Sequence, residues 1–402
     1  MELTKEEQSM LDGEEGEGVQ KAVEILLALG KIYDAGRFIP VSSAQVAGVS
    51  YKNLGDAGLE FLEDWANKGA KVRIPTTLNP AGIDIENWKK LGISDEFAQK
   101  QIRVIEAYKS MGIQPSCTCT PYLAGNLPKQ GEHVAWSESS AVSYANSVIG
   151  ARTNREGGPS ALAAAIAGRT PEYGLHLDED REPNLLVEVK CELNSISDFG
   201  ALGYIIGKEA GNSIPYFKGI KQADSDSLKS LGAAMAASGA VALYHVEGIT
   251  PEAKLGTTST GELGTTPETL TIENLDDGYK SLNSDAQDID LVAIGCPHAS
   301  LNELKKISNL LDGKKIKSEL WITTSRKIML AAGNEVAKIE SSGAKVVADT
   351  CMIVAPVEEL GFKTMATNAG KAAFYAPSHC NLNVRFGTLE QCINAAITGK
   401  WS

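Results

Sequence analysis

The chain has 402 residues, of which 43% are hydrophobic, enough for a large core and more than one lobe. Its formal net charge of −13 at pH 7 argues against binding to nucleic acid or to an acidic membrane surface, because both need a basic protein face. The sequence contains no apolar run of about 18 residues, so we expect no membrane-spanning helix.

The N-terminal segment is acidic and lacks the apolar stretch of a secretory signal, so we interpret the protein as cytoplasmic. From there, helix and strand patterns alternate almost to the end of the chain. The expected helices are 20–33, 57–67, 95–111, 228–238, 301–311 and 334–342. The expected strands are 71–75, 184–190, 240–246, 289–294, 320–323 and 345–348. Such alternation indicates an α/β protein with parallel sheets.

The domain organisation is predicted from one change in composition. Residues 248–286 are polar and rich in Thr, Gly and Glu, which is typical of a connecting segment. We therefore expect one or more N-terminal α/β lobes over 1–247 and a C-terminal α/β lobe over 287–402.

Three of the seven cysteines directly follow predicted strands. Cys296 and Cys351 come after the strands over 289–294 and 345–348, and Cys119 follows a further predicted strand. Ligands bind outside the carboxyl ends of strands in open parallel sheets, so three thiols far apart in sequence can converge there. Three thiolates suit a 4Fe–4S cluster that leaves one iron open as a Lewis acid for the loss of water, whereas four suit electron transfer.

The cysteine pattern has alternatives. A free cysteine is also a common small buried residue, and that interpretation stays open for each of the three taken alone. Cys191 and Cys392 lie in apolar strand and helix patterns and are interpreted as core. Cys117, two residues before Cys119, and Cys380 are fallback ligands. The odd count in an intracellular chain disfavours disulfides.

Four loops rich in Gly, Ser, Thr or Asn are candidates for holding an anionic substrate. They cover 42–50, 76–82, 136–141 and 368–372. Backbone N–H groups and helix N-termini can cradle an anion, and the last loop adds Lys371, which is also a candidate catalytic residue. Each loop taken singly is equally typical of an ordinary connection with a helix cap.

The segment 150–160 carries Arg152 and Arg155 beside two glycines. A guanidinium suits bidentate contact with a carboxylate or phosphate, so both arginines are candidate substrate contacts. The alternative is a pair of surface arginines in a turn before a helix capped by Ser160.

One of the five histidines is a candidate catalytic residue. His298 lies two residues after Cys296, so it is the best placed for proton transfer. The other four are interpreted as structural, and they are His133, His176, His245 and His379.

Taken in order, these motifs resemble the aconitase X family. The stretches that carry the resemblance are 43–50, 75–82, 119–123, 135–141, 152–160, 295–298 and 349–351. They cover nearly the whole chain, and the C-x-x-C pair of ordinary aconitases is absent from this sequence. The resemblance implies an aconitase-like, multi-lobe α/β/α fold with parallel sheets around a central iron–sulfur cluster site.

The resemblance also implies roles for individual residues. Cys119, Cys296 and Cys351 would hold a 4Fe–4S cluster. The substrate contacts implied are Gly48, Val49, Ser50, Asn79, Pro80, Ser139, Ser140 and Lys371. A small subunit with a swivelling domain would close the site and bring a serine used as base, so this chain alone should be inactive.

Within the family, a separate large subunit of this length implies a hydro-lyase that dehydrates (R)-5-phosphomevalonate to trans-anhydromevalonate 5-phosphate, in a modified mevalonate pathway of isoprenoid biosynthesis. The alternative within the family is dehydration of cis-3-hydroxy-L-proline, which would keep the fold and the cluster. A non-catalytic iron–sulfur scaffold or sensor is a third possibility, against which stand the open iron and the polar loops.

Overall fold

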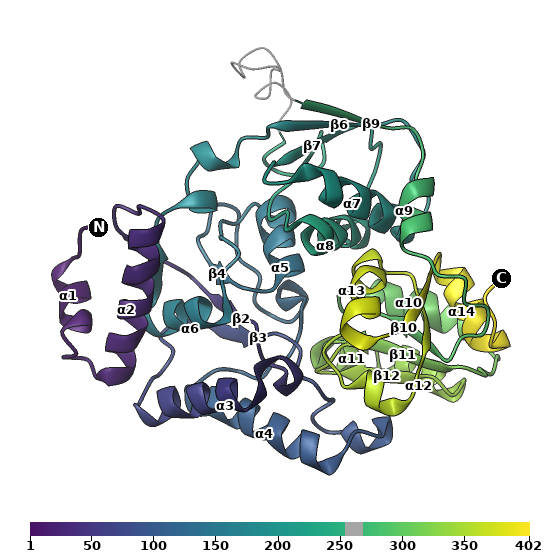
Figure 1. Ribbon diagram of the computed structural model, residues 1–402, viewed down its shortest axis with the longest axis horizontal. Coiled ribbons are helices and arrows are strands. Elements are labelled where there is room, and N and C mark those ends of the chain that lie inside the picture. The colour runs from purple at the N-terminus through teal and green to yellow at the C-terminus, as the bar shows by residue number, and fades with distance from the viewer. Residues whose placement is uncertain (254–267) are drawn as a thin grey trace. The chain divides into compact units, whose positions relative to one another are not determined.

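The computed structural model describes residues 1–253 and 268–402. Its described part divides into two compact units, Met1–Glu182 and Pro183–Ser402 (Figure 1). No helix among the described residues is long and apolar enough to cross a membrane.

The N-terminal unit contains a three-stranded parallel sheet in the order β3-β2-β4. These strands span Ala44–Val46 (β2), Thr76–Leu78 (β3) and Ala135–Trp136 (β4), and an antiparallel pair joins Phe38–Pro40 (β1) to Arg169–Pro171 (β5). Because β2, β3 and β4 run in one direction, the loops that follow them leave from one edge of the sheet. Those loops are the first three of the four that the sequence predicts to hold an anionic substrate.

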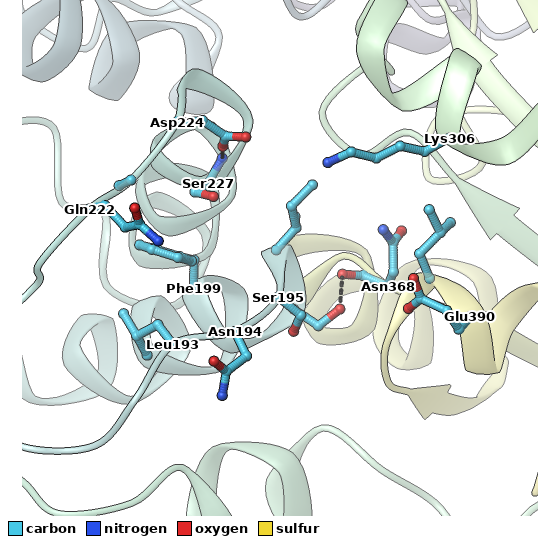
Figure 2. A pocket seen from close by; sticks show the side chains of 14 residues that line it. Leu193, Asn194, Ser195, Phe199, Gln222, Asp224, Ser227, Lys306, Asn368 and Glu390 are labelled. Atoms are coloured by element: carbon cyan, nitrogen blue, oxygen red, sulfur yellow. Dashed lines mark hydrogen bonds between the residues drawn. The ribbon is translucent and has the colours of Figure 1, made fainter.

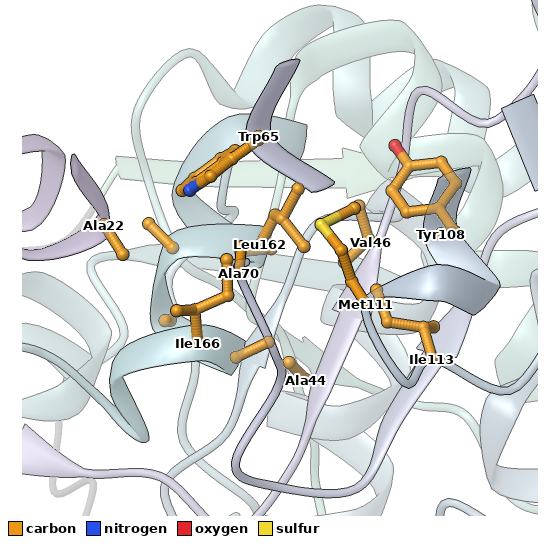
Figure 3. Packing of buried hydrophobic residues seen from close by; sticks show 14 of the residues in the cluster. Ala22, Ala44, Val46, Trp65, Ala70, Tyr108, Met111, Ile113, Leu162 and Ile166 are labelled. Atoms are coloured by element: carbon orange, nitrogen blue, oxygen red, sulfur yellow. The ribbon is translucent and has the colours of Figure 1, made fainter. Parts of the chain in front are cut away.

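The helices of this unit lie before and between its strands in the sequence. They are α1 (Lys5–Leu11), α2 (Glu17–Ile32), α3 (Tyr51–Asn67), α4 (Asp95–Ser110), α5 (Ser139–Tyr144) continued by a π-helix (Ala145–Ile149), and α6 (Gly158–Ala167). Helix α6 is apolar on every side, and all its residues from Ser160 onward are buried, as expected for a helix inside the core. Figure 3 shows Leu162 of α6 packed with Trp65 and Met111.

The C-terminal unit contains two parallel sheets, in the orders β12-β11-β10-β13-β14 and β8-β7-β6-β9. The first is formed by Leu291–Ile294 (β10), Glu319–Thr324 (β11), Lys345–Ala348 (β12), Thr364–Thr367 (β13) and Asn383–Phe386 (β14). The second is formed by Leu185–Val189 (β6), Pro215–Lys218 (β7), His245–Val246 (β8) and Glu268–Ile272 (β9). The parallel sheets and the helices between their strands confirm the predicted α/β class.

The helices of the C-terminal unit lie between its strands in sequence. They are α7 (Ile196–Ala210), α8 (Ser225–Gly239), α9 (Asp276–Ser281), α10 (Leu301–Leu311), α11 (Arg326–Ala331), α12 (Gly333–Ser341), α13 (Gly370–Cys380) and α14 (Leu389–Thr398). Helices α7 and α8 approach closely through glycines. A Cβ added to Gly203 would lie 2.4 Å from the Leu231 carbonyl oxygen, so a larger residue there would force the helices apart.

Most predicted elements occur within a few residues of their expected ends, but three strands, over 71–75, over 240–246 and before Cys119, do not. The predicted strand over 71–75 is wrong, because Val72 and Arg73 donate to the carbonyls of Met111 and Ala165 instead of pairing in a sheet. Of the strand predicted over 240–246, only His245–Val246 (β8) forms a strand. The predicted connecting segment 248–286 lies partly outside the described residues, and its described part includes β9, which pairs with β6, and α9.

Candidate active site

The loops after β2, β3 and β4 are tied to one another by short hydrogen bonds. Asn79 N–H donates to the Val46 carbonyl at 2.9 Å. Ser137 Oγ accepts from Ala47 N–H at 2.9 Å and donates to the Gln45 carbonyl at 2.7 Å. The structure therefore brings the predicted contacts of the first two loops, 48–50 and 79–80, to one sheet edge beside the start of α5.

Gln101, which no sequence pattern indicates, links two of these loops. It lies on α4 with no exposed surface. Its Oε1 accepts from the backbone N–H groups of Tyr51 at 2.8 Å and Gly82 at 2.9 Å, and its Nε2 donates to the Val49 carbonyl at 2.8 Å. One side chain thus fixes the backbone on both sides of the predicted substrate residues. Its position in a helix gave no signal of this role.

Cys119 reaches the same edge without a regular strand before it. The predicted strand is reduced to one isolated bridge between Thr77 and Gln114, so that prediction is wrong in detail. The chain still runs along β3, since Thr118 N–H donates to the Leu78 carbonyl at 2.9 Å. Gln45 Nε2 donates to the Thr118 carbonyl at 3.0 Å, which anchors the residue just before Cys119.

Ser139 and Ser140 lie in the first turn of α5, as predicted, but a carboxylate already caps that helix. Glu138 accepts from Ala141 N–H at 2.8 Å. Both serine hydroxyls also donate to Glu138, at 3.4 Å from Ser139 and 2.5 Å from Ser140. Hydrogen-bond donors that the sequence predicts for an anionic ligand are therefore already bonded to Glu138.

The two candidate arginines lie at opposite edges of the sheet. The backbone of 152–155 runs parallel to the β4 segment, with Arg152 beside His133 and Arg155 beside Trp136. Arg152 lies at the amino edge, where it forms an ion pair with Asp178. Arg155 lies at the carboxyl edge, where the loops gather.

Glu156 is a buried carboxyl group beside this segment. The hydroxyls of Ser160 and Thr170 donate to its two oxygens. Burial raises the pKa of Glu156 above its usual value, against the lowering effect of both hydroxyls. The predicted cap at Ser160 is wrong, because α6 begins at Gly158 with Gly157 as its N-cap.

In the C-terminal unit, Cys296, Cys351 and Lys371 follow three strands of one parallel sheet. Cys296 comes after β10, Cys351 after β12, and Lys371 lies in the first turn of α13, after β13. All three residues therefore lie at the carboxyl edge of that sheet, as the sequence predicts. Each is partly exposed, which suits a ligand site better than a core position.

The loop that carries Cys296 is clamped to the end of β11. Thr323 Oγ1 donates to the Gly295 carbonyl at 2.7 Å, and Thr324 Oγ1 donates to the Ala299 carbonyl at 2.7 Å. Gly295 has a φ of 101°, and a Cβ there would lie 2.1 Å from the Thr323 carbonyl oxygen, so only glycine fits. The position of Cys296 is thus set by buried contacts on both sides.

The loop that carries Cys351 is held by two buried side chains. Asp349 pairs with Arg326, whose Nε lies 3.1 Å from Asp349 Oδ2. Cys380 Sγ donates to the Met352 carbonyl at 3.5 Å, so this predicted fallback ligand is buried and engaged with the backbone next to Cys351.

His298 connects the two cysteine loops. Its side chain has no exposed surface, and its Nε2 lies 2.9 Å from the Thr350 carbonyl oxygen. A carbonyl only accepts, so Nε2 is the protonated nitrogen in this contact. Its own carbonyl accepts from Lys229 Nζ at 3.2 Å.

The C-terminal unit also holds a polar cavity of about 640 Å³ that the sequence does not indicate. It is lined by the starts of α7, α8 and α14 and by α10. Figure 2 shows the Lys306 ammonium and the Asp224 carboxylate directed into it from opposite sides, and Asn368 of the fourth predicted loop also lines it.

All seven cysteines are free thiols. Cys392 has no exposed surface, which confirms its prediction as core, and burial raises the pKa of its thiol. Cys191 is partly exposed at the end of β6, so its prediction as core is wrong. Within residues 1–253 and 268–402, no group of three His, Cys, Asp or Glu side chains is close enough to hold a metal ion.

Comparisons with known proteins decide the family. The models for the first, second and third domains of aconitase X match residues 1–179, 183–277 and 289–398. The chain belongs to the aconitase X family. This confirms the resemblance drawn from the motifs and accounts for nearly the whole chain.

Individual members of the aconitase X family are similar to this chain over nearly all of its length. The phosphomevalonate dehydratase large subunit of Methanocaldococcus jannaschii is 51% identical, over 98% of this chain and 99% of that protein. A cis-3-hydroxy-L-proline dehydratase of Pseudomonas aeruginosa is 38% identical, over 98% of this chain and 70% of that protein. The holo-form of Thermococcus kodakaraensis aconitase X superposes with a TM-score of 0.91 at 51% identity, covering 98% of this chain and 100% of that one. This likeness confirms the predicted aconitase X architecture.

Proposed function

We propose that this chain is the large subunit of a hydro-lyase that dehydrates (R)-5-phosphomevalonate to trans-anhydromevalonate 5-phosphate, a step toward isoprenoids. The observation that carries the proposal is similarity: four archaeal relatives with phosphomevalonate dehydratase names are 51–54% identical over nearly the whole chain. The hydroxyproline dehydratases are less similar, at 34–38%. The "large subunit" names of the four archaeal relatives support a small partner subunit that completes the active enzyme.

We further propose that Cys119, Cys296 and Cys351 hold a 4Fe–4S cluster. The donor set suits that group: thiolates are the usual ligands of iron–sulfur clusters, and two of these cysteines are partly exposed at one sheet edge on rigidly held loops. When bound, the cluster would supply a Lewis-acidic iron for a substrate hydroxyl and carboxylate. Thiol ligands also require a reducing compartment, which supports the cytoplasm.

The chain's own residues would bind and orient the substrate. Asn79 Oδ1 is buried and accepts no hydrogen bond among the described residues, so it has capacity to accept one from a substrate hydroxyl. The backbone around 48–50 would contact the substrate in the conformation that Gln101 fixes. Lys371 and Arg155 are the cations proposed for the phosphate, while Ser139 and Ser140 would contact it through a first turn already capped by Glu138.

The deciding experiment offers the anaerobically reconstituted two-subunit enzyme phosphomevalonate, mevalonate and cis-3-hydroxy-L-proline side by side. We expect turnover of the phosphate ester alone. Turnover of the imino acid without turnover of the phosphate ester would refute the substrate assignment and leave the family assignment intact.

A further inference from the structure

A buried ionic cluster lies between α8 and the start of α10. Lys229 is 4% exposed, and its Nζ lies 3.1 Å from Asp226 Oδ1 and 2.5 Å from Glu303 Oε2. Burial by itself would lower the pKa of Lys229, but the charges of Glu303 and Asp226 outweigh it and raise that pKa above its usual value. The ammonium is therefore charged and fixed between two carboxylates.

The two carboxylates are held in turn by the N-cap of α10. Ser300 N–H donates to Glu303 Oε2 at 2.9 Å, and Ser300 Oγ donates to Asp226 Oδ2 at 2.8 Å. No partner in this cluster can move without leaving another buried charge or donor unsatisfied. The hydrogen bond from Lys229 Nζ to the His298 carbonyl consequently anchors that backbone position firmly.

The imidazole of His298 continues the connection to the second cysteine loop. Its Nε2–H donates to the carbonyl of Thr350, the residue before Cys351, while His298 itself lies two residues after Cys296. The ionic cluster, the His298 side chain and the Thr350 carbonyl thus form one continuous chain of polar contacts, here named the brace. The brace runs along the carboxyl edge of the five-stranded sheet, from α8 to the loop after β12.

We propose that His298 is a positioning residue that sets the separation of Cys296 and Cys351, with Lys229 as its anchor. The inference deepens the proposed function and rests on its iron–sulfur cluster. It replaces the role in proton transfer that the sequence suggested. A side chain with no exposed surface, whose ring N–H is already donated to a backbone carbonyl, is badly placed to exchange protons with a substrate.

Two substitutions at His298 distinguish a positioning role from a role in proton transfer. In His298→Gln the terminal amide N–H can still reach the Thr350 carbonyl, but the amide does not titrate. In His298→Leu the volume is kept and the donor is lost. Residues that support metal ligands typically contribute about 10- to 100-fold in metal affinity. We therefore expect the Leu variant to lose iron to a chelator about 10–100 times faster than the unaltered chain, and the Gln variant to lie within about threefold of it.

The readouts are iron and sulfide per chain, the rate of iron loss to the chelator, and the pH profile of turnover with the small subunit. His245→Gln, another buried histidine of this unit on β8, is the matched control and should leave all of them unchanged. Lys229→Met should reproduce the Leu variant, whereas Lys306→Met, an exposed lysine on α10, should not. Thermal unfolding shows whether Lys229→Met has folded.

Two results would overturn the proposal. Full iron content and normal chelator resistance in folded His298→Leu would show that the brace does not set the cysteines. Normal iron in His298→Gln, with turnover lowered by about 10²- to 10⁴-fold and one limb of the pH profile lost, would show proton transfer instead. Absence of iron from the unaltered chain would refute the proposed cluster itself, which is visible before any variant is made.

Discussion

Replacing Gln101 with leucine tests whether one buried amide holds the predicted substrate loops of the N-terminal unit. Leucine has nearly the same volume and the same preference for helix, so α4 should persist. The substitution removes the acceptor of the Tyr51 and Gly82 N–H groups and the donor to the Val49 carbonyl. Its effect should therefore fall on the loops and not on the helix.

The size of the effect follows from the groups left without partners. A buried donor or acceptor that loses its partner costs about 1–3 kcal/mol, and loop relaxation toward water recovers part of that sum. We expect a net loss of about 2–4 kcal/mol in the local stability of the loops. That is a large part of the 5–15 kcal/mol typical of a whole domain, but it leaves the unit folded.

Hydrogen exchange measures this directly. A loss of about 2–4 kcal/mol corresponds to roughly 30- to 1000-fold faster exchange of the Tyr51 and Gly82 amides, with little change in the helix amides of α4. Since displacements of about 1 Å can lower rates about 100-fold, turnover with the small subunit should fall in parallel. Gln99→Leu, at an exposed position of the same helix, is the control. Unchanged exchange and turnover in a folded Gln101→Leu variant would refute the reasoning.

Further substitutions and one pH experiment test the rest of the molecule. Cys351→Ser should abolish the iron content and visible absorption of the anaerobic protein, whereas Cys392→Ser, in the core, should not; full iron in the first variant would refute its assignment as ligand. Lys371→Ala should lower turnover of phosphomevalonate about ten- to a hundredfold, because a charge-assisted contact contributes about 1.5–3 kcal/mol. Burial raises the pKa of Glu156 above its value in the unfolded chain. As pH rises above 4.5, the unfolded chain therefore releases this proton before the folded protein does. The stability that the protonated Glu156 contributes is lost over that rise in pH. Glu156→Gln should therefore raise the thermal stability at pH 7 and reduce that loss, and an unchanged melting temperature would contradict this. Without its small subunit the chain should show negligible turnover, and strong activity would place the base within this chain.

The helices and the α/β class were predictable because they depend on local chemistry. Amphipathic spacing and caps such as Ser94 and Ser300 lie within a few residues of the helix that they start. Strands β2, β3 and β4 are only two or three residues long, too short to show a period in the sequence. They exist because neighbouring backbones supply hydrogen bonds, and those partners come from distant parts of the chain.

The positions of candidate site residues were predictable from the sequence where strand direction sets them. They were not predictable where the register or the burial of a segment sets them. Cys296, Cys351 and Lys371 lie at the expected edge because parallel strands end together. Arg152 and Arg155 seemed equivalent in sequence, yet three residues of extended chain carry them to opposite edges of a short sheet. Three extended residues are enough to run from one edge of this short sheet to the other. Which arginine lies at which edge depends on the register of the pairing, and the sequence does not show that register.

Buried polar side chains near the candidate loops bond to the backbone or to one another, which changes what these polar loops can do. Ser139 and Ser140 donate to Glu138, and Gln101 serves two loops at once. The hydroxyls and amides that made these segments resemble anion sites are therefore largely occupied with one another. In the proposed function, these loops would therefore contact a charged substrate mainly through the backbone that those side chains fix. Such a site gains its precision from rigid backbone, so substitutions of its supporting residues should be as damaging as those of the residues that touch the substrate.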